Sequence, residues 1–304
     1  GSCLISTSAQ NTFVKRINKG ENRRAVQVEA YHERLFVLSA GTCNNQFECS
    51  LIMEIDNQGS VIWEKKLKWL DIGPNSMIID DDVIYLSGNH PSQKKWLWHH
   101  MSIDGGDSLR TYEIYNSTNV FDRMFNLGQV KFQDEFCVYG PGNQDGNESS
   151  LMYFVNKEGE LDTLLTPFTS SRDADPWEII AYEDECLILF IRYEEFGEDP
   201  QSIVAKVTAD KRLDWAYISE EYLLNDAVPK GAVLNDSLAV YNTRDGFQGS
   251  QNIRCIHRDS TIFWGNENPQ QIGLYKEYFE VISLMDGNIL GVGSWGDAMA
   301  EPLV

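Results

Sequence analysis

Basic side chains are scarce in this sequence. Its 304 residues carry 25 Lys and Arg against 46 Asp and Glu, which gives a formal net charge of −21 and a sequence pI near 4.5. Sequence-independent nucleic-acid binding takes most of its affinity from Lys and Arg that neutralise phosphates. Anionic membrane surfaces likewise attract basic segments. The charge therefore argues against nucleic acid and against a membrane surface as partners.

Long apolar runs and paired metal-binding cysteines are also missing. No run of apolar residues is long enough to span a bilayer, so we expect no transmembrane segment. The six cysteines include no Cys-x-x-Cys, which leaves a zinc ribbon without support, and we expect neither a metal nor a cofactor. Cys43 and Cys49 flank a short polar segment and are candidates for a disulfide in an oxidising compartment. The other apolar-run cysteines, Cys137, Cys186 and Cys255, are expected to be buried thiols.

What the sequence does contain is a repeat with a period of about 50 residues. One unit is an apolar strand, a polar turn and a second strand. Its equivalent positions are Trp63, Thr111, Thr163, Trp215 and Trp264. A second apolar strand follows an acidic or glycine turn and recurs six times, from residues 35–38 to residues 289–292. Four short strands in about 50 residues, here named A to D in order, make the blade of a β-propeller. We therefore predict an all-β, six-bladed β-propeller of four-stranded blades.

The two ends of the repeat array complement each other. The residues after Trp264 are enough for strands A, B and C of a sixth blade but not for strand D. Near the start, residues 12–17 resemble residues 62–67, and Phe13 aligns with Trp63. The N-terminal strand is therefore predicted to be the outer strand of the last blade, which closes the ring and removes two exposed sheet edges. Residues 11–304 would then be a single domain, and we expect a monomer.

Residues 1–10 have the features of a processed leader. Gly1-Ser2 is typical of a tag remnant. The segment that follows, residues 3–10, is similar to the end of a secretory signal peptide, with Thr7 and Ala9 at −3 and −1 of a cut before Gln10. We therefore expect an exported protein that is periplasmic, attached to the cell surface or extracellular.

One repeat carries a more specific resemblance. Its Asp56, Gly59 and Trp63 give the pattern Asp-x-x-Gly-x-apolar-x-Trp after an apolar strand. This pattern resembles the repeats of quinoprotein-like β-propellers, and more closely the six-bladed propellers of bacterial exported proteins, including surface and type IX-secreted ones. The other copies lack the glycine or the tryptophan. The quinone and calcium ligands of the larger quinone-dependent dehydrogenases have no counterparts that we can place in this sequence.

Ligands of propellers usually sit on the face that carries the B–C and D–A loops. The B–C loops here are long and polar, and such loops on a rigid scaffold often bind ligands. Aromatic rings beside hydrogen-bonding groups suit a protein or glycan ligand. The candidate binding residues are His90, Trp96, Arg192, Tyr193, Glu194, Arg244, Asp245, Trp295 and Asp297, with Lys94, Lys95 and Phe247 beside them.

Two hypotheses for the function remain open. The sequence holds no catalytic motif and favours a non-enzymatic binding or scaffold propeller that recognises a protein or glycan. The alternative is a carbohydrate-active hydrolase or lyase, because several six-bladed propellers are glycosidases. Such an enzyme would need two carboxylates at a defined separation in the central funnel. The candidates for that pair are Asp173, Asp175, Glu194, Asp245 and Asp297.

Overall fold

The computed structural model describes a chain of β-strands. It covers residues 23–43, 47–56, 58–73, 75–90, 93, 95–116, 128–144, 147–222, 231–235, 238–244, 251–257, 262–266, 275–283 and 289–296. Side chains are described mainly between residues 25 and 219. Within these ranges no helix has the length and apolar character needed to cross a bilayer.

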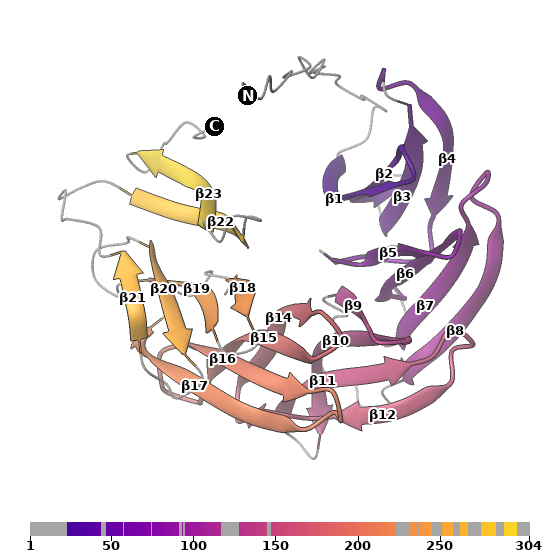
Figure 1. Cartoon of the computed structure of the whole chain (residues 1–304). Coiled ribbons are helices and arrows are strands. Elements are labelled where there is room, and N and C mark those ends of the chain that lie inside the picture. The colour runs from indigo at the N-terminus through magenta and orange to yellow at the C-terminus, as the bar shows by residue number, and fades with distance from the viewer. Residues whose placement is uncertain are drawn as a thin grey trace, which may run out of the picture.

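The strands form antiparallel sheets around a common centre (Figure 1). The first two sheets are β1 (Arg23–Tyr31), β2 (Arg34–Cys43), β3 (Phe47–Ile55) and β4 (Val61–Leu67), then β5 (Met77–Asp80), β6 (Val83–Asn89), β7 (Lys95–Ser102) and β8 (Ser108–Asn116). The third is β9 (Gly128–Phe132), β10 (Glu135–Gln144), β11 (Asn147–Val155) and β12 (Leu161–Leu165), joined by β13 (Thr169–Ser170). The fourth is β14 (Asp173–Tyr182), β15 (Cys186–Glu194), β16 (Gln201–Thr208) and β17 (Leu213–Tyr222). The last two are β18 (Gly231–Asn235), β19 (Leu238–Arg244), β20 (Gln251–His257) and β21 (Ile262–Asn266), then β22 (Tyr275–Ser283) with β23 (Ile289–Gly296).

The predicted all-β propeller is confirmed, but the prediction of six four-stranded blades is not. Four of the sheets have four strands, one has five and one has two. The third sheet departs from the repeat because the chain turns back after β12 and pairs β13 with β11. The two-stranded sheet is β22–β23, and the N-terminal strand predicted to complete it lies outside the described residues.

The core lies between neighbouring sheets. The first strand of each sheet faces the centre of the ring, and the fourth strand of each four-stranded sheet lies at its rim (Figure 1). Ile52 of β3 belongs to a buried cluster with Leu86 of β6, and Met152 of β11 to one with Leu189 of β15. Alternate residues of each middle strand therefore face a neighbour on either side, which explains why these strands are apolar throughout.

The turn in the repeat motif has a physical reason. In the first sheet, Asp56 Oδ1 accepts from the amides of Gln58 and Ser60 at 2.9 and 2.7 Å, and Gly59 takes a positive φ of 74°. Asn156 plays the same part in the third sheet, where Gly159 has φ of 80°. Short side chains with oxygen acceptors stabilise such turns, and glycine adopts positive φ without strain.

An aromatic ring of one sheet lies against the turn of the next. A Cβ on Gly106 would stand 2.6 Å from the ring of Trp63, and a Cβ on Gly159 would stand 2.4 Å from Tyr112. The residue in contact in the second sheet is thus Tyr112, one position after the predicted Thr111. The C–D turn of the second sheet, between the paired residues Met101 and Ser108, is one residue longer than that of the first, between Ile55 and Val61. Glycine is required here both for its φ and for the space that it leaves.

In the fourth sheet, an ion pair takes the place of the contact between an aromatic ring and a turn glycine. Lys211 occupies its C–D turn with φ of 60°. The outer strand of the preceding sheet carries Thr163 and no ring at this position, so a side chain fits. The Lys211 ammonium lies 4.9 Å from the ring centre of Phe154 and pairs with Glu135 at 2.5 Å. Loss of the glycine is therefore compensated by an ion pair with the neighbouring sheet.

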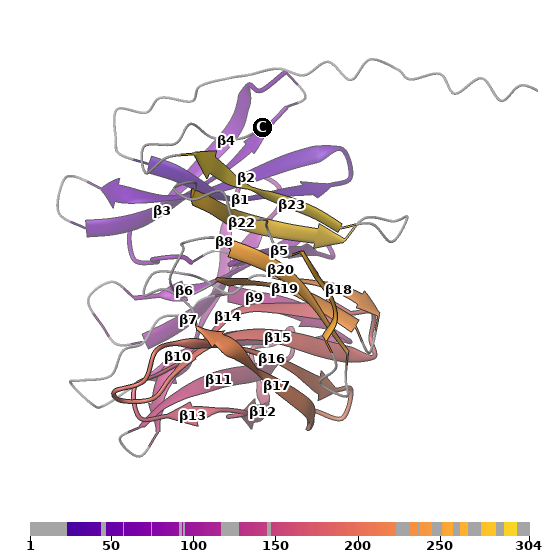
Figure 2. The same cartoon turned by 90° about the vertical axis from the view of Figure 1, so that its left-hand side faces the viewer.

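The connections between strands gather at two opposite faces (Figure 2). One face carries the A–B and C–D turns. The other carries the B–C loops and the D–A connections between sheets, and we call it the loop face.

Candidate functional site

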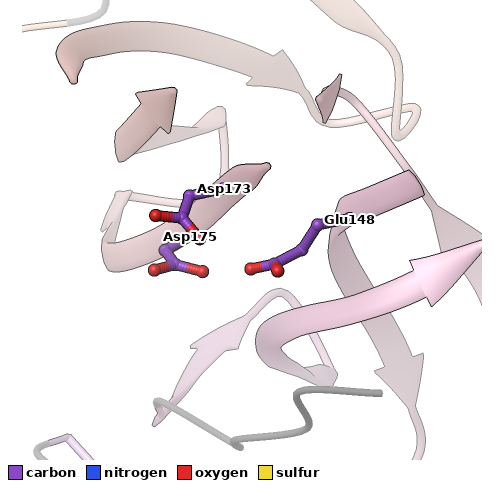
Figure 3. A group of neighbouring side chains, drawn as sticks. All are labelled: Glu148, Asp173 and Asp175. Atoms are coloured by element: carbon purple, nitrogen blue, oxygen red, sulfur yellow. The ribbon is translucent and has the colours of Figure 1, made fainter. Parts of the chain in front are cut away.

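A cluster of charged side chains lies on the loop face where the third and fourth sheets meet. We call it the junction site and define it as Glu148, Arg172, Asp173, Asp175, Arg192 and Glu194. Glu148 is the second residue of β11, Asp173 and Asp175 lie in the first three residues of β14, and Arg192 and Glu194 lie in the last three of β15. One carboxylate oxygen from each of Glu148, Asp173 and Asp175 lies within 4.8 Å of the others. Figure 3 shows these three carboxylates pointing toward one another.

The fifth strand of the third sheet places these residues together. Ser170 of β13 is the register partner of Glu148, so the chain that runs on into β14 passes beside the third sheet. The Ser170 hydroxyl donates to the backbone carbonyl of Glu194, which ties this connection to the fourth sheet. Along β14 and β15, Asp173 is paired with Glu194 and Asp175 with Arg192. The departure from the four-stranded repeat therefore builds the junction site.

Arg192 holds two buried carboxylates in place. Its Nη1 donates to Asp173 Oδ2 at 2.5 Å, and its Nη2 donates to Glu194 Oε2 at 2.8 Å. Asp173 and Glu194 are each only 2% exposed. Burying a charge is costly unless it is paired and hydrogen-bonded, so this guanidinium is needed for both carboxylates.

A second guanidinium contacts Glu194 from the solvent side. Arg172 Nη1 lies 2.5 Å from Glu194 Oε1, and its side chain is half-exposed. Burial and a hydrogen bond with Asp173 raise the pKa of Glu194, while the charges of Arg192 and Arg172 oppose that rise. The junction site thus has four carboxylates and two guanidiniums, and its charge is negative when the carboxylates are ionised.

The turn that follows β15 is hydrogen-bonded to the D–A connection. Glu195 accepts from the Tyr193 hydroxyl and from both the amide and the hydroxyl of Ser171. The Phe196 amide donates to Ser171 Oγ at 2.9 Å. Burial, followed by the bond to Glu195, raises the pKa of Tyr193 to about 12. A phenol with a raised pKa is poorly suited to act as a nucleophile at neutral pH.

The three converging carboxylates could hold a hard cation. Calcium takes oxygen ligands at about 2.3–2.6 Å, so oxygens around one ion stand up to about 5 Å apart. The spacing of Glu148, Asp173 and Asp175 meets this limit. Arg192 already bonds to Asp173, and it would compete with an ion for that carboxylate. The arrangement suits any cationic group, whether a metal ion or an organic cation.

The structure brings together a subset of the predicted residues. Arg192 and Glu194 meet in the junction site, beside two members of the proposed carboxylate set, Asp173 and Asp175. Tyr193 lies next to the site and bonds to Glu195. Lys95 pairs with Glu113 at 2.6 Å.

Two other predicted binding residues have different settings. Trp96 is fully buried on β7 and makes an edge contact with Tyr153 of the third sheet, so its assignment to the loop face is wrong. It belongs to the core because β7 begins at Lys95, one residue before it. His90 shapes the B–C hairpin through its backbone, whose amide donates to the carbonyl of Lys95 at 3.0 Å.

The remaining predicted residues have side chains, or whole residues, outside the part of the chain that the structure describes. Arg244 ends β19 and Trp295 lies on β23, but their side chains are outside the described set. Lys94, Asp245, Phe247 and Asp297 lie outside the described residues. Cys49 is buried and disulfide-bonded, while its pairing with Cys43 stays a prediction. Cys137 and Cys186 are buried, as predicted, and are not disulfide-bonded.

The sequence did not single out Glu148, Arg172, Ser171 or Phe196. Glu148 follows Asn147 in what reads as a polar hairpin, and only the pairing with β13 brings it to Asp173. The adjacent charges Glu194-Glu195 were a visible signal for the neighbouring turn.

Comparisons with known proteins give similarity at the level of fold. No family model matches the chain, and no curated protein matches its sequence. Among solved structures, the subtype N10 neuraminidase-like protein of A/little yellow-shouldered bat matches with a TM-score of 0.58 and 8% identity, over 92% of this chain and 91% of that one. Hydrazine synthase of Kuenenia stuttgartiensis matches with a TM-score of 0.55 and 10% identity, over 93% and 98%. The Hadza microbial sialidase Hz136 matches with a TM-score of 0.51 and 10% identity, over 90% and 62%.

These identities are too low to carry activity from one protein to another. Proteins with one fold have many functions, so function must be argued from the site. Together with the sheet topology, the likenesses show that the chain is a β-propeller.

Proposed function

We propose that the protein is an exported or surface-associated, non-enzymatic binding propeller that recognises a protein or glycan on its loop face. The observation that carries this proposal is the fixed charge pairing of the junction site. Arg192 is bonded to both Asp173 and Glu194, so these buried pairs form a rigid base for the partly exposed Glu148, Asp175 and Arg172 beside them. Groups held in this way present a preorganised surface to a ligand, which lowers the cost of binding.

Other observations support export. Cys49 is disulfide-bonded, and disulfides persist mainly in oxidising compartments. The signal-like segment before Gln10 supports the same location.

One observation favours a second function, a carbohydrate-active hydrolase. The raised pKa of Glu194 is a property of general acids, and Asp173, which is hydrogen-bonded to it, lies near Asp175. Retaining glycosidases place two carboxyl groups about 5 Å apart. Glu194 is however 2% exposed and bonded to two arginines, which leaves a substrate little access to it.

The test compares Asp175→Asn with the wild type. Both proteins are applied to arrays of immobilised glycans and peptides, and to chromogenic glycosides for turnover. We expect a ligand whose affinity falls by about tenfold (about 1.4 kcal/mol) in the variant, without turnover. The matched control is Glu185→Gln, an exposed carboxylate in the A–B turn on the opposite face, which should bind like the wild type.

Two results would overturn the proposal. Turnover of a glycoside that is lost in Asp175→Asn would establish the hydrolase instead. Equal binding by all three proteins would mean that the ligand contacts another part of the molecule.

The proposal includes a closed ring of six blades. Trp63 covers Gly106 and Tyr112 covers Gly159, so each ring of an outer strand covers the turn of the next sheet. Gly59 lies in the equivalent turn of the first sheet and is buried. Phe13 aligns with Trp63 in the repeat, and it is therefore the residue expected to cover Gly59 and to complete the sheet of β22 and β23.

Phe13→Ala tests the closure. We expect it to lower the free energy of unfolding by about 3 kcal/mol, because loss of a buried aromatic ring leaves a cavity. Trp63→Ala provides the calibration, since its ring has a described partner turn. Urea unfolding followed by tryptophan fluorescence measures both. A Phe13→Ala protein as stable as the wild type, beside a destabilised Trp63→Ala, would contradict a closed ring.

A further inference from the structure

The turn beside the junction site exposes an aromatic ring. Phe196 is 86% exposed, whereas the other exposed large hydrophobic residues with described side chains lie between 44% and 58%. A single exposed apolar residue is ordinary on a protein surface. Phe196 differs because hydrogen bonds within its turn and to the D–A connection hold its backbone in place.

The Phe196 turn, which we define as residues 195–199, is fixed by hydrogen bonds. The Glu198 amide donates to the Glu195 carbonyl at 3.1 Å, and Gly197 between them has φ of 88°. The Phe196 amide donates to Ser171 of the D–A connection. Pro200 is buried and anchors the far end of the turn. The ring is therefore presented to solvent by an ordered backbone, and little conformational entropy is lost when a ligand covers it.

Carboxylates flank Phe196 in the sequence of this turn. Glu198 and Asp199 are exposed, and hydrogen bonds from Ser171 and Tyr193 lower the pKa of Glu195 and keep it ionised. The junction site adds the partly exposed Glu148 and Asp175 on the same face, while its buried Asp173 and Glu194 are already paired with arginines. An aromatic face attracts cations, and neighbouring carboxylates add Coulomb attraction that depends on salt.

We propose that the Phe196 turn docks a basic protein segment, with a Lys or Arg of the partner placed over the Phe196 ring and its neighbours paired with the carboxylates. This inference rests on the proposed function and names its partner. Charge complementarity favours a cationic peptide over a glycan, because a neutral sugar gains nothing from the ionised carboxylates beyond hydrogen bonds. The charge of −21 over the whole chain also steers cationic partners toward the protein.

The experiment uses the full chain and a fluorescein-labelled peptide of alternating lysine and serine. Two comparison ligands are used in the same assay. One is the same peptide with acetylated lysines, and the other is a labelled neutral hexasaccharide of glucose. Fluorescence anisotropy gives the affinity at low and at high salt. We expect the lysine peptide to bind, the acetylated peptide to bind at least tenfold more weakly, and affinity to fall as salt rises.

Variants locate the contact. Phe196→Ala should weaken binding of the lysine peptide about fivefold, and Phe196→Trp should preserve or strengthen it because indole is the best cation–π partner. Glu198→Gln with Asp199→Asn should weaken binding and flatten its salt dependence. The matched control is Leu161→Ala, which removes a 53% exposed hydrophobic residue from the outer strand β12.

The outcomes separate this inference from the proposed function. Equal binding by Phe196→Ala and Leu161→Ala overturns the Phe196 contact. Hexasaccharide binding that Phe196→Ala abolishes overturns the basic partner in favour of a glycan, and the proposed function stands. If the lysine peptide does not bind while an array ligand still depends on Asp175, this inference alone fails. Glycoside turnover lost in Asp175→Asn overturns the proposed function, and the peptide assay then decides the docking surface independently.

Discussion

Arg192→Met is expected to lower the free energy of unfolding by about 3–5 kcal/mol at neutral pH, which is the usual cost of removing one partner from a buried ion pair. The Arg192 side chain is 11% exposed, and the substitution leaves Asp173 and Glu194 buried without their shared guanidinium. Methionine has a similar length and an apolar body, so loss of packing contributes little. Urea unfolding at several pH values measures the effect.

The pH dependence identifies the cause. Without Arg192, the pKa of Glu194 rises further in the folded protein, while in the unfolded chain it stays near 4.3. The folded state then binds a proton more readily than the unfolded state, so the variant gains stability relative to the wild type as pH falls from 7 toward 5. Adding Glu194→Gln should recover part of the loss at pH 7.

The control is Arg212→Met, whose guanidinium is 80% exposed and pairs with Asp210 at the surface. Surface pairs contribute less than about 1 kcal/mol, so this variant should resemble the wild type. If the two variants have the same stability, the pairing of Arg192 does not hold the junction together.

The second large effect is a loss of stability in acid. His99 and His100 of β7 are 1% and 5% exposed, and burial lowers the pKa of each from 6.5 to about 4. The His100 ring lies 4.3 Å from that of Trp98 and 4.7 Å from that of Tyr85. His99 Nδ1 lies 2.8 Å from the Thr111 hydroxyl. Both rings are therefore neutral in the folded protein at neutral pH.

The direction of the change in stability with pH follows from proton uptake by the histidines. Between pH 6.5 and 4 the unfolded chain binds protons at these histidines and the folded protein does not, so stability falls as pH falls through this window. Each histidine contributes about 3 kcal/mol to the loss. His100→Phe keeps an aromatic ring among the neighbours and should make the protein more acid-resistant. His32→Gln, at an exposed position in the A–B turn of the first sheet, is the control and should unfold in acid as the wild type does.

Urea midpoints at pH 7, 5.5 and 4.5 give the comparison. A wild-type curve with the same pH slope as that of His100→Phe would mean that burial of His100 has no share in acid unfolding.

Several features of the fold were visible in the sequence for a clear physical reason. Strands that are buried on both sides are apolar throughout, so residues 187–190 and their counterparts stand out at each repeat. The Asp56 turn was equally visible, because positive φ restricts the residues that fit. By contrast, the pairing of β13 with β11 could not be predicted, since two residues, Thr169 and Ser170, carry no periodicity.

The site was harder to predict because it depends on contacts between sheets. Glu194 was a candidate through its place near a B–C loop, and its bond to Arg192 is local to β15, but its bond to Arg172 arises from the course of the chain after β13. Trp96 shows the opposite error. An aromatic residue near a loop was assigned to binding, whereas the strand starts one residue earlier and buries it.

The aromatic-on-glycine contacts all run in one direction around the ring. Trp63 needs the turn at Gly106, and Tyr112 needs the turn at Gly159, so each ring depends on a sheet that comes later in the chain. Chains are synthesised from the N-terminus, and domains form as the sequence emerges. On the ribosome the second sheet would therefore cover the Trp63 ring left open by the first, and the third sheet would cover Tyr112. A product truncated after the first or the second sheet would end with an uncovered aromatic ring.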